Sequence, residues 1–382
     1  MKPLRLLDQR FAPAMAWAEI DLRAVAHNLD AIKKTAGPKL KILCVVKADA
    51  YGHGNIAIAK LLEKKGVDFL GISDLHEGIV LRKAGIKKPI LMFENTLPEH
   101  AKHLVENNIT PIVCTLELAR ALNRLGAQKR KKIPVHIKVD TGMGRLGVAP
   151  DDAFALAQIL VRLPWISLEG ACTHFALSDS NSDFTRQQQK TFLFIAYALQ
   201  EKLNILLRYV HASNSLGIVA YKNKGFSMVR AGLILYGMYP SPKIKSKILL
   251  KPVMSVKSRV TLVKNVEKGT GISYGHRFIT PCRMKVATVA IGYHDGYFRA
   301  FSNKAHVLIH GKRCPVLGTV TMDQIMVDVS RLKGVKIGDE VCVLGRQGKG
   351  EVSADELAKL ANTINYEITC SLGSRVARIF KK

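Results

Sequence analysis

The stretch ILCVVKADAYGHG, residues 42–54, shows the pattern on which the predicted fold rests. Its apolar run Ile42–Val46 has the length and β-branched content of a buried strand, and Lys47 follows it directly. Downstream, segments of helix length with apolar residues three and four positions apart alternate with further short strands. The alternation predicts eight strands, at Ile42–Val46, Phe69–Ile72, Ile90–Phe93, Thr110–Cys114, Val135–Val139, Leu168–His174, Tyr209–His211 and Ser227–Arg230.

The pattern changes after Pro240 and Pro242, and this change predicts a second domain. Strand-like runs then follow one another without helices between them, and only Ala354–Asn362 has a helical pattern. Eight strand–helix units ending near residue 240 match the size of a TIM barrel. The predicted fold class is α/β, a (β/α)8 TIM barrel over residues 12–244 followed by a mostly β domain over residues 245–382. Residues 1–11 are expected to pack with the β domain. The predicted β strands are Val256–Val263, Lys285–Ile291, His306–His310, Val316–Val320, Ile325–Val329 and Glu340–Leu344.

Composition excludes several classes of protein. A content of 48% hydrophobic and 23% charged residues is typical of a folded globular chain rather than a disordered or fibrous one. No apolar run approaches the roughly 20 residues that cross a bilayer, and Arg5, Asp8 and Arg10 interrupt the first residues where a secretory signal would be apolar. The seven cysteines form no C-x-x-C pair, which favours reduced thiols over disulfides or zinc. We therefore expect a cytoplasmic protein with no membrane partner.

The charge balance is unusual and raises the question of a polyanionic partner. The chain has 58 Lys and Arg against 30 Asp and Glu, a net charge of +28. The basic residues are dispersed along the sequence, however, and the densest run, Lys129–Lys132, has no zinc-finger or aromatic RNA-binding motif beside it. We expect a solvated basic surface and no nucleic-acid partner.

Polar residues at the predicted strand ends are candidates for chemistry, because barrel active sites form at the carboxyl ends of the strands. A lysine there, such as Lys47, can form a Schiff base with an aldehyde cofactor, although a solvated lysine is the commoner case. Histidines at such positions are also more often structural than catalytic. The candidates are Lys47, Lys138, Asp140, His174, His211 and Arg230, with Arg145 in the turn TGMGRLG, residues 141–147.

Small residues after the seventh and eighth strands favour a phosphate site. HASNS, residues 211–215, and the segment with Gly232 and Gly237 leave backbone amides free, and Ser215 adds a hydroxyl. The G-x-G-x-x-G match at 142–147 lacks the helix that should follow directly, so a dinucleotide site is not predicted. No H-E-x-x-H or similar cluster occurs, and no metal site is predicted.

Nine motifs in order along nearly the whole chain resemble the bacterial alanine racemase family. They are VVKADAYGHG (45–54), KVDTGMGRLG (138–147), THFA (173–176), HASNS (211–215), VRAGLILYG (229–237), SYGHRF (273–278), GYHDGY (292–297), GTVTMDQIMVDV (318–329) and YEITC (366–370). The resemblance implies a pyridoxal 5'-phosphate enzyme that interconverts L-alanine and D-alanine and supplies D-alanine for peptidoglycan. It also implies a cofactor-binding barrel followed by a β domain, in agreement with the strand count.

The resemblance assigns cofactor contacts to this sequence. Lys47 would hold the cofactor covalently and act as one catalytic base, while Arg230 would face the pyridine nitrogen. A guanidinium can only donate hydrogen bonds, so that nitrogen would stay unprotonated and racemisation would be favoured over transamination. The implied cofactor-binding residues are Lys47, Tyr51, His174, His211, Ser215, Arg230, Gly232 and Tyr366, of which Tyr51, Ser215 and Tyr366 would bind the phosphate.

Racemisation requires a second base on the opposite face of the substrate, and the resemblance assigns it to Tyr274. A phenol is a weak base at neutral pH unless a cation lies beside it, and Arg145 would supply that cation and contact the substrate carboxylate. Lys138, often carbamylated in the family, would fix Arg145. The remaining implied residues are Met322 for substrate and Asp323 and Tyr293 in supporting roles. In the family, Tyr274, Tyr293, Met322 and Asp323 complete the active site of the other subunit, so a homodimer is expected.

The sequence departs from the family pattern at three positions, and alternatives remain. Asp49 stands where Asn is frequent, Ala377 where Pro is usual, and His294 where Ala is usual beside Tyr293. His294 leaves substrate access and breadth open, so a racemase of broader specificity is one alternative. A non-enzymatic pyridoxal-phosphate carrier would lack the β domain, and a decarboxylase of the same fold type would need an acidic residue in place of Arg230.

Overall fold

The computed structural model describes residues 14–382, which divide into two compact units. One unit is Ala24–Lys251, called the barrel unit below. The other, the β unit, combines the described residues up to Arg23 with Pro252–Lys382. Residues 1–11, for which the sequence predicts packing with the β domain, lie outside the described residues.

The barrel unit is built on eight parallel strands, which confirms the predicted fold class. The strands follow the order β8-β7-β6-β5-β4-β3-β2-β9, and a hydrogen bond from Ser227 N to Val210 O, 3.0 Å, joins the two ends of the sheet. The eight predicted strands agree with these within about two residues. The bounds are β2 Lys41–Val45, β3 Phe69–Ile72, β4 Ile90–Met92, β5 Ile109–Val113, β6 Ile133–Lys138, β7 Ile166–Cys172, β8 Tyr209–His211 and β9 Met228–Ala231.

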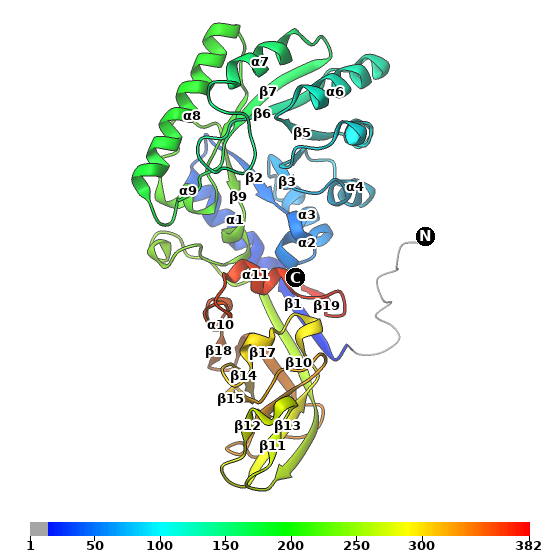
Figure 1. Ribbon diagram of the computed structural model, residues 1–382, viewed down its shortest axis with the longest axis vertical. Coiled ribbons are helices and arrows are strands. Elements are labelled where there is room, and N and C mark those ends of the chain that lie inside the picture. The colour runs from blue at the N-terminus through cyan, green and yellow to red at the C-terminus, as the bar shows by residue number, and fades with distance from the viewer. Residues whose placement is uncertain (1–13) are drawn as a thin grey trace. The chain divides into compact units, whose positions relative to one another are not determined.

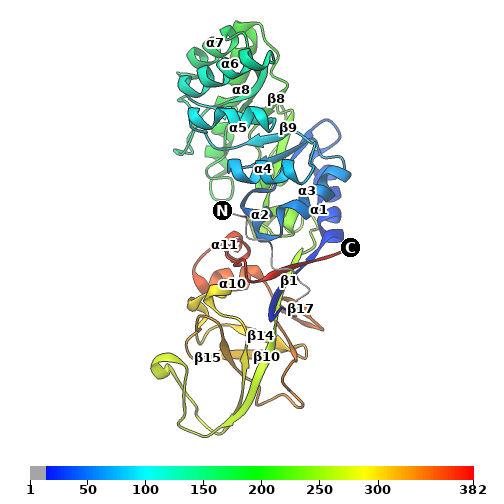
Figure 2. The same ribbon diagram turned by 90° about the vertical axis from the view of Figure 1, so that its right-hand side faces the viewer.

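Helices surround the barrel strands on the outside (Figure 1), because their buried residues recur at helical spacing and their other faces are polar. Figure 2 shows α4 to α7 in succession along one side of the barrel. The bounds are α1 Leu22–Ala36, α2 Lys47–Gly52, α3 Asn55–Lys64, α4 Leu75–Lys83, α5 Ala101–Glu106, α6 Leu116–Lys129, α7 Ala153–Arg162, α8 Ser182–Leu203 and α9 Ser215–Ala220. In this arrangement every strand ends at one end of the barrel and every strand begins at the other.

The β unit contains a nine-stranded sheet in the order β18-β17-β14-β15-β16-β13-β10-β1-β19. Strand β1 (Ala16–Asp21) pairs antiparallel with β10 and parallel with β19, although the chain of the barrel unit separates it from both. The remaining bounds are β10 Met254–Val266, β11 Gly271–Ile272, β12 Phe278–Ile279, β13 Met284–Val289, β14 His306–Ile309, β15 Lys312–Leu317, β16 Ile325–Asp328, β17 Glu340–Gln347, β18 Gly350–Val352 and β19 Ala377–Lys381, with helices α10 Ala354–Ala361 and α11 Asn365–Cys370.

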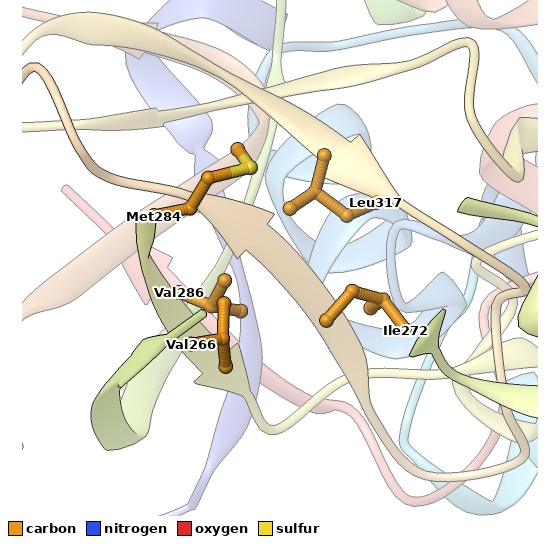
Figure 3. Packing of buried hydrophobic residues seen from close by; sticks show 5 residues of the cluster. All are labelled: Val266, Ile272, Met284, Val286 and Leu317. Atoms are coloured by element: carbon orange, nitrogen blue, oxygen red, sulfur yellow. The ribbon is translucent and has the colours of Figure 1, made fainter. Parts of the chain in front are cut away.

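A small apolar cluster lies between the strands of the β unit, and its side chains point toward one another in Figure 3. The alternation of β10 and β13 places one apolar face inward, with Val266 and Val286 almost completely buried. Burial of such aliphatic groups contributes about 1.5–3 kcal/mol each. The cluster consists of Val266, Ile272, Met284, Val286 and Leu317.

Two details of the β unit differ from the prediction. Residues 365–370 form the helix α11, which the sequence does not predict because NYEITC is short and rich in residues that favour strands. The strand predicted at Val316–Val320 is instead β15, Lys312–Leu317. It ends there because Gly318 has a φ of +70°, and a side chain at that position would meet the carbonyl of Ile272 at 2.4 Å.

Over residues 14–382, no helix is both long enough and apolar enough to span a membrane.

Candidate active site

The predicted barrel residues lie where the strands end. Lys47 comes two residues after β2, Lys138 is the last residue of β6, and His211 is the last residue of β8. The register sets Lys138 opposite Cys172, and Cys172 opposite His211. Parallel strands therefore bring these side chains to one level of the barrel.

Arg230 occupies the interior and is held from several sides. It is 5% exposed, and its Nη2 donates hydrogen bonds of 2.6 Å to the carbonyls of Thr173 and Ala212. Nη2 also lies 3.3 Å from Nδ1 of His174. Burial lowers the pKa of this guanidinium, yet arginine stays protonated at physiological pH because its ordinary pKa is so high. The barrel thus contains a fixed, buried cation.

A chain of two histidines continues from Arg230. Nη1 of Arg230 lies 3.3 Å from Nδ1 of His211, and Nε2 of His211 lies 3.0 Å from Nδ1 of His136. Because the guanidinium only donates, Nδ1 of His211 must accept, so its proton lies on Nε2 and is donated to His136. His136 then carries its own proton on Nε2, a buried atom with no hydrogen-bond partner within residues 14–382.

Both rings of this chain are neutral. Burial lowers the pKa of His136 to about 3 and that of His211 well below its ordinary value, and the charge of Arg230 adds to both effects. Neutral rings have one donor and one acceptor nitrogen each. The direction of the hydrogen bonds is therefore fixed by Arg230.

Several cations of the barrel affect the pKa of His174. Burial lowers its pKa to about 2. Nearby positive charges act in the same direction, so four predicted site residues lie within electrostatic range of one imidazole. In decreasing order of effect these are Arg230, Lys138, Arg145 and Lys47.

Lys138 is buried without a carboxylate beside it. It is 6% exposed, and no ion pair of this lysine occurs in the described part of the chain. Burial lowers the pKa of its ammonium group, and the charges of Arg230 and Arg145 lower it further. The two thiols near it, Cys114 and Cys172, offer no compensating anion because burial raises the thiol pKa values, to about 12 for Cys114.

The loop that carries Arg145 is closed at its base. Val148 N donates to Lys138 O at 2.9 Å, and Asp140 N donates to Val148 O at 2.8 Å. A side chain at Gly147, whose φ is +132°, would meet the backbone of Asp140 at 2.6 Å, so only glycine permits this closure. The carboxylate of Asp140 accepts the amides of residues 142 and 143, which fixes the turn before Arg145.

The segment after Lys47 has an uncommon backbone. Residues 48–51 of α2 all have φ between 52° and 57°, so α2 is one left-handed turn. Each such residue costs about 1–2 kcal/mol, and local hydrogen bonds offset the strain. Glu77 accepts the amide of Ala48, and Asp49 accepts the amide of Asn55 at 2.8 Å. The ring of Tyr51 packs on Tyr236, with centroids 4.9 Å apart.

A cradle forms where Tyr51, Ser215 and Gly232 meet. The backbone amides of Gly232 and Ile234 point at Oγ of Ser215, at 3.2 and 3.4 Å. A Cβ atom on Gly232 would lie 2.8 Å from the Tyr51 hydroxyl and 3.6 Å from Oγ of Ser215. The missing side chain leaves a space lined by two hydroxyls and backbone N–H groups, a donor set suited to a phosphate.

The predicted residues of the β unit also gather in short loops. Tyr274 and Met322 are 72% and 50% exposed, high values for large apolar side chains, and Tyr293 is 43% exposed. The Tyr293 and Met322 loops are joined by backbone hydrogen bonds, Tyr293 N to Thr321 O at 3.0 Å and His294 N to Met322 O at 3.1 Å. Tyr366 lies in α11, half-buried.

Arg375 links these loops by hydrogen bonds that the sequence does not predict. Its Nε donates to Asp295 at 2.8 Å and its Nη1 to Asp323 at 2.7 Å. Asp295 is 3% exposed and also accepts the amide of Gly292 at 2.9 Å. One guanidinium therefore fixes the turn that carries Tyr293 and the loop that carries Met322, and it gives Asp323 a defined partner.

His136 and Arg375 are the main residues that sequence reasoning missed. His136 had a signal, because it lies two residues before Lys138 and therefore on the same face of the strand. Arg375 had none, since its partners are 80 and 52 residues away. Within the described residues, no group of three His, Cys, Asp or Glu side chains could hold a metal ion.

Family models match both parts of the chain. The N-terminal domain of alanine racemase matches residues 20–240, and the C-terminal domain of alanine racemase matches residues 253–380. Alanine racemase of Halothermothrix orenii is 43% identical over 366 residues, which cover 96% of each chain. Alanine racemase of Methanococcus maripaludis is 42% identical over 367 residues, 95% of this chain and 98% of its own.

Solved structures of the same family share the fold. Alanine racemase of Clostridium difficile superposes with a TM-score of 0.91 at 40% identity, covering 97% of this chain and 96% of its own. Alanine racemase of Bacillus anthracis with bound L-Ala-P gives a TM-score of 0.90 at 35% identity, with the same coverage. The resemblance inferred from the nine motifs is confirmed over nearly the full length. The chain belongs to the alanine racemase family, and it is an isomerase.

Proposed function

We propose that this chain interconverts L-alanine and D-alanine with pyridoxal 5'-phosphate and a two-base mechanism. The observation that carries the proposal is that Lys47, Lys138 and Arg230 lie at the carboxyl ends of β2, β6 and β9, with Arg230 Nη2 3.3 Å from Nδ1 of His174. Arg145 can hold a substrate carboxylate, Arg230 can face the ring nitrogen of a cofactor, and Lys47 supplies an amine. The amino acid produced would serve peptidoglycan synthesis.

The residues present fit the cofactor. In the space beside Gly232, a phosphate would accept hydrogen bonds from the hydroxyls of Tyr51 and Ser215 and from the two backbone amides that here donate to Oγ of Ser215, with Tyr366 as a further predicted partner. Arg230 offers only N–H groups, so a pyridine nitrogen placed against it would accept and remain unprotonated. Bound pyridoxal phosphate would acidify the α-hydrogen of an attached amino acid by drawing electrons from the α-carbon. Lys47 would hold the cofactor aldehyde, and His211 and His174 would keep Arg230 in place.

Two side-chain atoms would serve as the bases that exchange the α-proton of the substrate. Nζ of Lys47 would exchange the α-proton with D-alanine, and the phenol oxygen of Tyr274 would exchange it with L-alanine on the opposite face. Arg145 would bind the substrate carboxylate and favour the ionised phenol. Met322 would contact the substrate, with Tyr293 and Asp323 in support.

We also propose a homodimer in which the β unit of one subunit completes the site of the other. The exposed Tyr274, Tyr293 and Met322 support this, because large side chains left bare on one chain are often covered in an assembly. The seven cysteines are all unpaired, as in a reducing compartment, and we propose the cytoplasm as the location.

Isotope exchange tests the two bases separately. Removing Tyr274 by Tyr274→Phe should lower racemisation about a hundredfold or more, the range typical of losing a positioned base. Exchange of the α-hydrogen of D-alanine in deuterium oxide requires only Lys47 and should persist more strongly than exchange from L-alanine. Equal loss from both enantiomers, in a folded variant that still binds the cofactor, would refute the assignment.

A labelling experiment tests the cofactor. Borohydride treatment of the purified protein should fix the cofactor to Lys47, and proteolysis should place the label within residues 40–60. Lys47→Arg should retain the fold and lose the label. A label elsewhere in the chain would exclude Lys47 as the attachment point.

Broader substrate range is the second candidate function, and His294 favours it. This residue stands beside Tyr293, and its amide is bound to Met322 O. Its imidazole replaces a small residue where substrate access is expected. Incubation with each L-amino acid, followed by separation of enantiomers, decides between alanine alone and a wider range.

A further inference from the structure

The end of the barrel at which the strands begin is strongly basic. Eight segments there connect a helix to the next strand, and Asp68 is their single acidic residue. Asp68 is already paired, since it lies 3.2 Å from Nζ of Lys41 and accepts the amide of Ile42. Segments 107–108 and 163–165 carry no charge. The other six are GPKL (37–40), KGVD (65–68), AGIKKP (84–89), RKK (130–132), NILLR (204–208) and YKNKGFS (221–227).

These basic side chains face solvent. Every Lys and Arg of the six segments is exposed except the half-buried Lys88. Exposed lysines in the last turns of the preceding helices, such as Lys34, Lys64 and Lys129, add to the same end, where the basic residues of these turns outnumber the acidic Glu63, Glu106 and Glu201. Ion pairs at this end join Lys41 to Asp68 and Lys65 to Asp30, and they leave most of the charge uncompensated.

Helix dipoles explain only part of this charge. A lysine in the last turn of a helix stabilises the negative end of the dipole, but the effect falls off within that turn. The basic residues of the connecting segments lie beyond the helices. At the opposite end of the barrel, the loops that lead from β2–β8 to the following helices contain more acidic than basic residues, namely Asp74, Glu94, Glu99, Asp140, Asp151, Asp152 and Asp179 against Arg145. The segment after β9 is an exception, because it contains Lys243, Lys245, Lys247 and Lys251.

We propose that the basic end of the barrel docks on the surface of an anionic lipid bilayer. A ring of loop ends carrying mostly lysine presents diffuse positive charge, each Lys contributing about 1 kcal/mol of attraction near an anionic membrane. Leu206, in the segment beside Arg208, is 75% exposed and can enter the headgroup layer. The candidate active site lies at the end where the strands terminate, so docking by the opposite end leaves it directed away from the lipid.

The same surface fits a nucleic acid less well. Recognition of a duplex uses an element that enters a groove, and binding of a single strand uses exposed aromatic rings. The aromatic residues of these segments, Trp165, Tyr221 and Phe226, are half-buried or buried. The proposal departs from the expectation of no membrane partner, because basic residues that are dispersed in the sequence are gathered at one end by the fold.

Vesicle binding tests the proposal. The full chain should sediment with phosphatidylcholine vesicles that contain phosphatidylglycerol, and not with phosphatidylcholine alone. Charge reversal at three exposed lysines of this end, Lys39→Glu, Lys132→Glu and Lys222→Glu together, should weaken partitioning about a hundredfold or more. The matched control reverses three exposed lysines elsewhere, Lys190→Glu, Lys333→Glu and Lys349→Glu, and should retain most of the binding.

Several outcomes would overturn the proposal. Equal binding to neutral and anionic vesicles, or equal loss in both triple variants, would exclude docking by this end. Tighter binding of an RNA or DNA probe than of vesicles at physiological salt, lost only in the first variant, would assign the surface to nucleic acid instead. Racemase activity and melting temperature, measured in parallel, should be unchanged in both variants, since neither alters a residue of the candidate site.

Discussion

Gly170 makes room for the ring of His136: a Cβ atom at position 170 would lie 2.7 Å from Nδ1 of that imidazole. The two residues pair across β6 and β7 next to a register shift, and the ring of Tyr209 stacks on that of His136 with centroids 5.4 Å apart. The imidazole is therefore fixed in place so that its Nδ1 meets His211. Since His211 in turn meets Arg230, a glycine on β7 helps to orient the buried cation.

We expect Gly170→Ala to displace His136 and to leave the N–H of His211 without an acceptor. Such a loss costs about 1–3 kcal/mol of unfolding free energy, and activity should fall as Arg230 loses its support. The control is the same change in a His136→Ala background, where the new methyl group has space. The two changes should then be clearly non-additive in urea unfolding. Additive losses would mean that His136 does not transmit the effect.

The depressed pKa of His174 predicts a dependence of stability on pH. Its folded pKa of about 2 lies below the unfolded value near 6.5, so the stability it contributes is complete above pH 6.5 and is lost as the pH falls through that value. Between about pH 6 and 4, the unfolded chain binds a proton that the folded chain does not, which corresponds to about 1.4 kcal/mol per pH unit. His174→Phe should reduce the slope by about one proton in urea titrations at several pH values. An unchanged slope would show that His174 is protonated in the folded protein.

The left-handed turn of α2 predicts an unusual response to glycine. Ala48→Gly relieves a positive φ of 52°, so we expect stability to be unchanged or to rise by up to about 1 kcal/mol. The matched change Ala127→Gly, at an exposed position of the right-handed helix α6, should lower stability by about 0.5–1 kcal/mol. Thermal denaturation of both variants measures the difference. Equal losses would argue against strain at residue 48.

Shared sites predict recovery of activity by subunit exchange. Lys47 belongs to the barrel unit and Tyr274 to the β unit, so a mixed dimer of Lys47→Ala and Tyr274→Phe chains contains one intact site if sites are shared. Mixing the two inactive proteins should then restore part of the activity. Absence of recovery, after exchange of subunits has been verified by mass spectrometry, would place both bases in the same chain.

Lys138 is predicted to react with carbon dioxide. Its depressed pKa increases the neutral amine, which attacks carbon dioxide, forms an N–C bond and releases a proton. The resulting carbamate would supply the anion that the surrounding cations lack, and it would fix Arg145. Protein equilibrated with ¹³C-bicarbonate should show a carbamate signal in NMR spectra that is missing from Lys138→Arg. A spectrum without this signal would exclude the modification under those conditions.

The strand pattern predicted the barrel well because several of the parallel strands are short, continuous apolar runs, such as Phe69–Ile72. The candidate site followed from topology, since the ends of parallel strands meet. Strand β1 was harder to predict from the sequence, because its partners are more than 200 residues away along the chain. The hydrogen-bond chain through His136 and the gathering of lysines at one end depend on three-dimensional placement. Local propensity carries no information on either.

The pairing of β1 with β19 has a consequence for the order of folding during synthesis. Residues 16–21 leave the ribosome long before their parallel partner, residues 377–381, is made. At elongation rates of about 5–20 residues per second, roughly 20–70 s separate the two. The whole barrel unit can fold in that interval, while β1 waits with an unpaired edge. A chaperone that shields exposed strand edges would therefore act on the nascent chain at β1, long before the proposed base Tyr274 of the β unit is made.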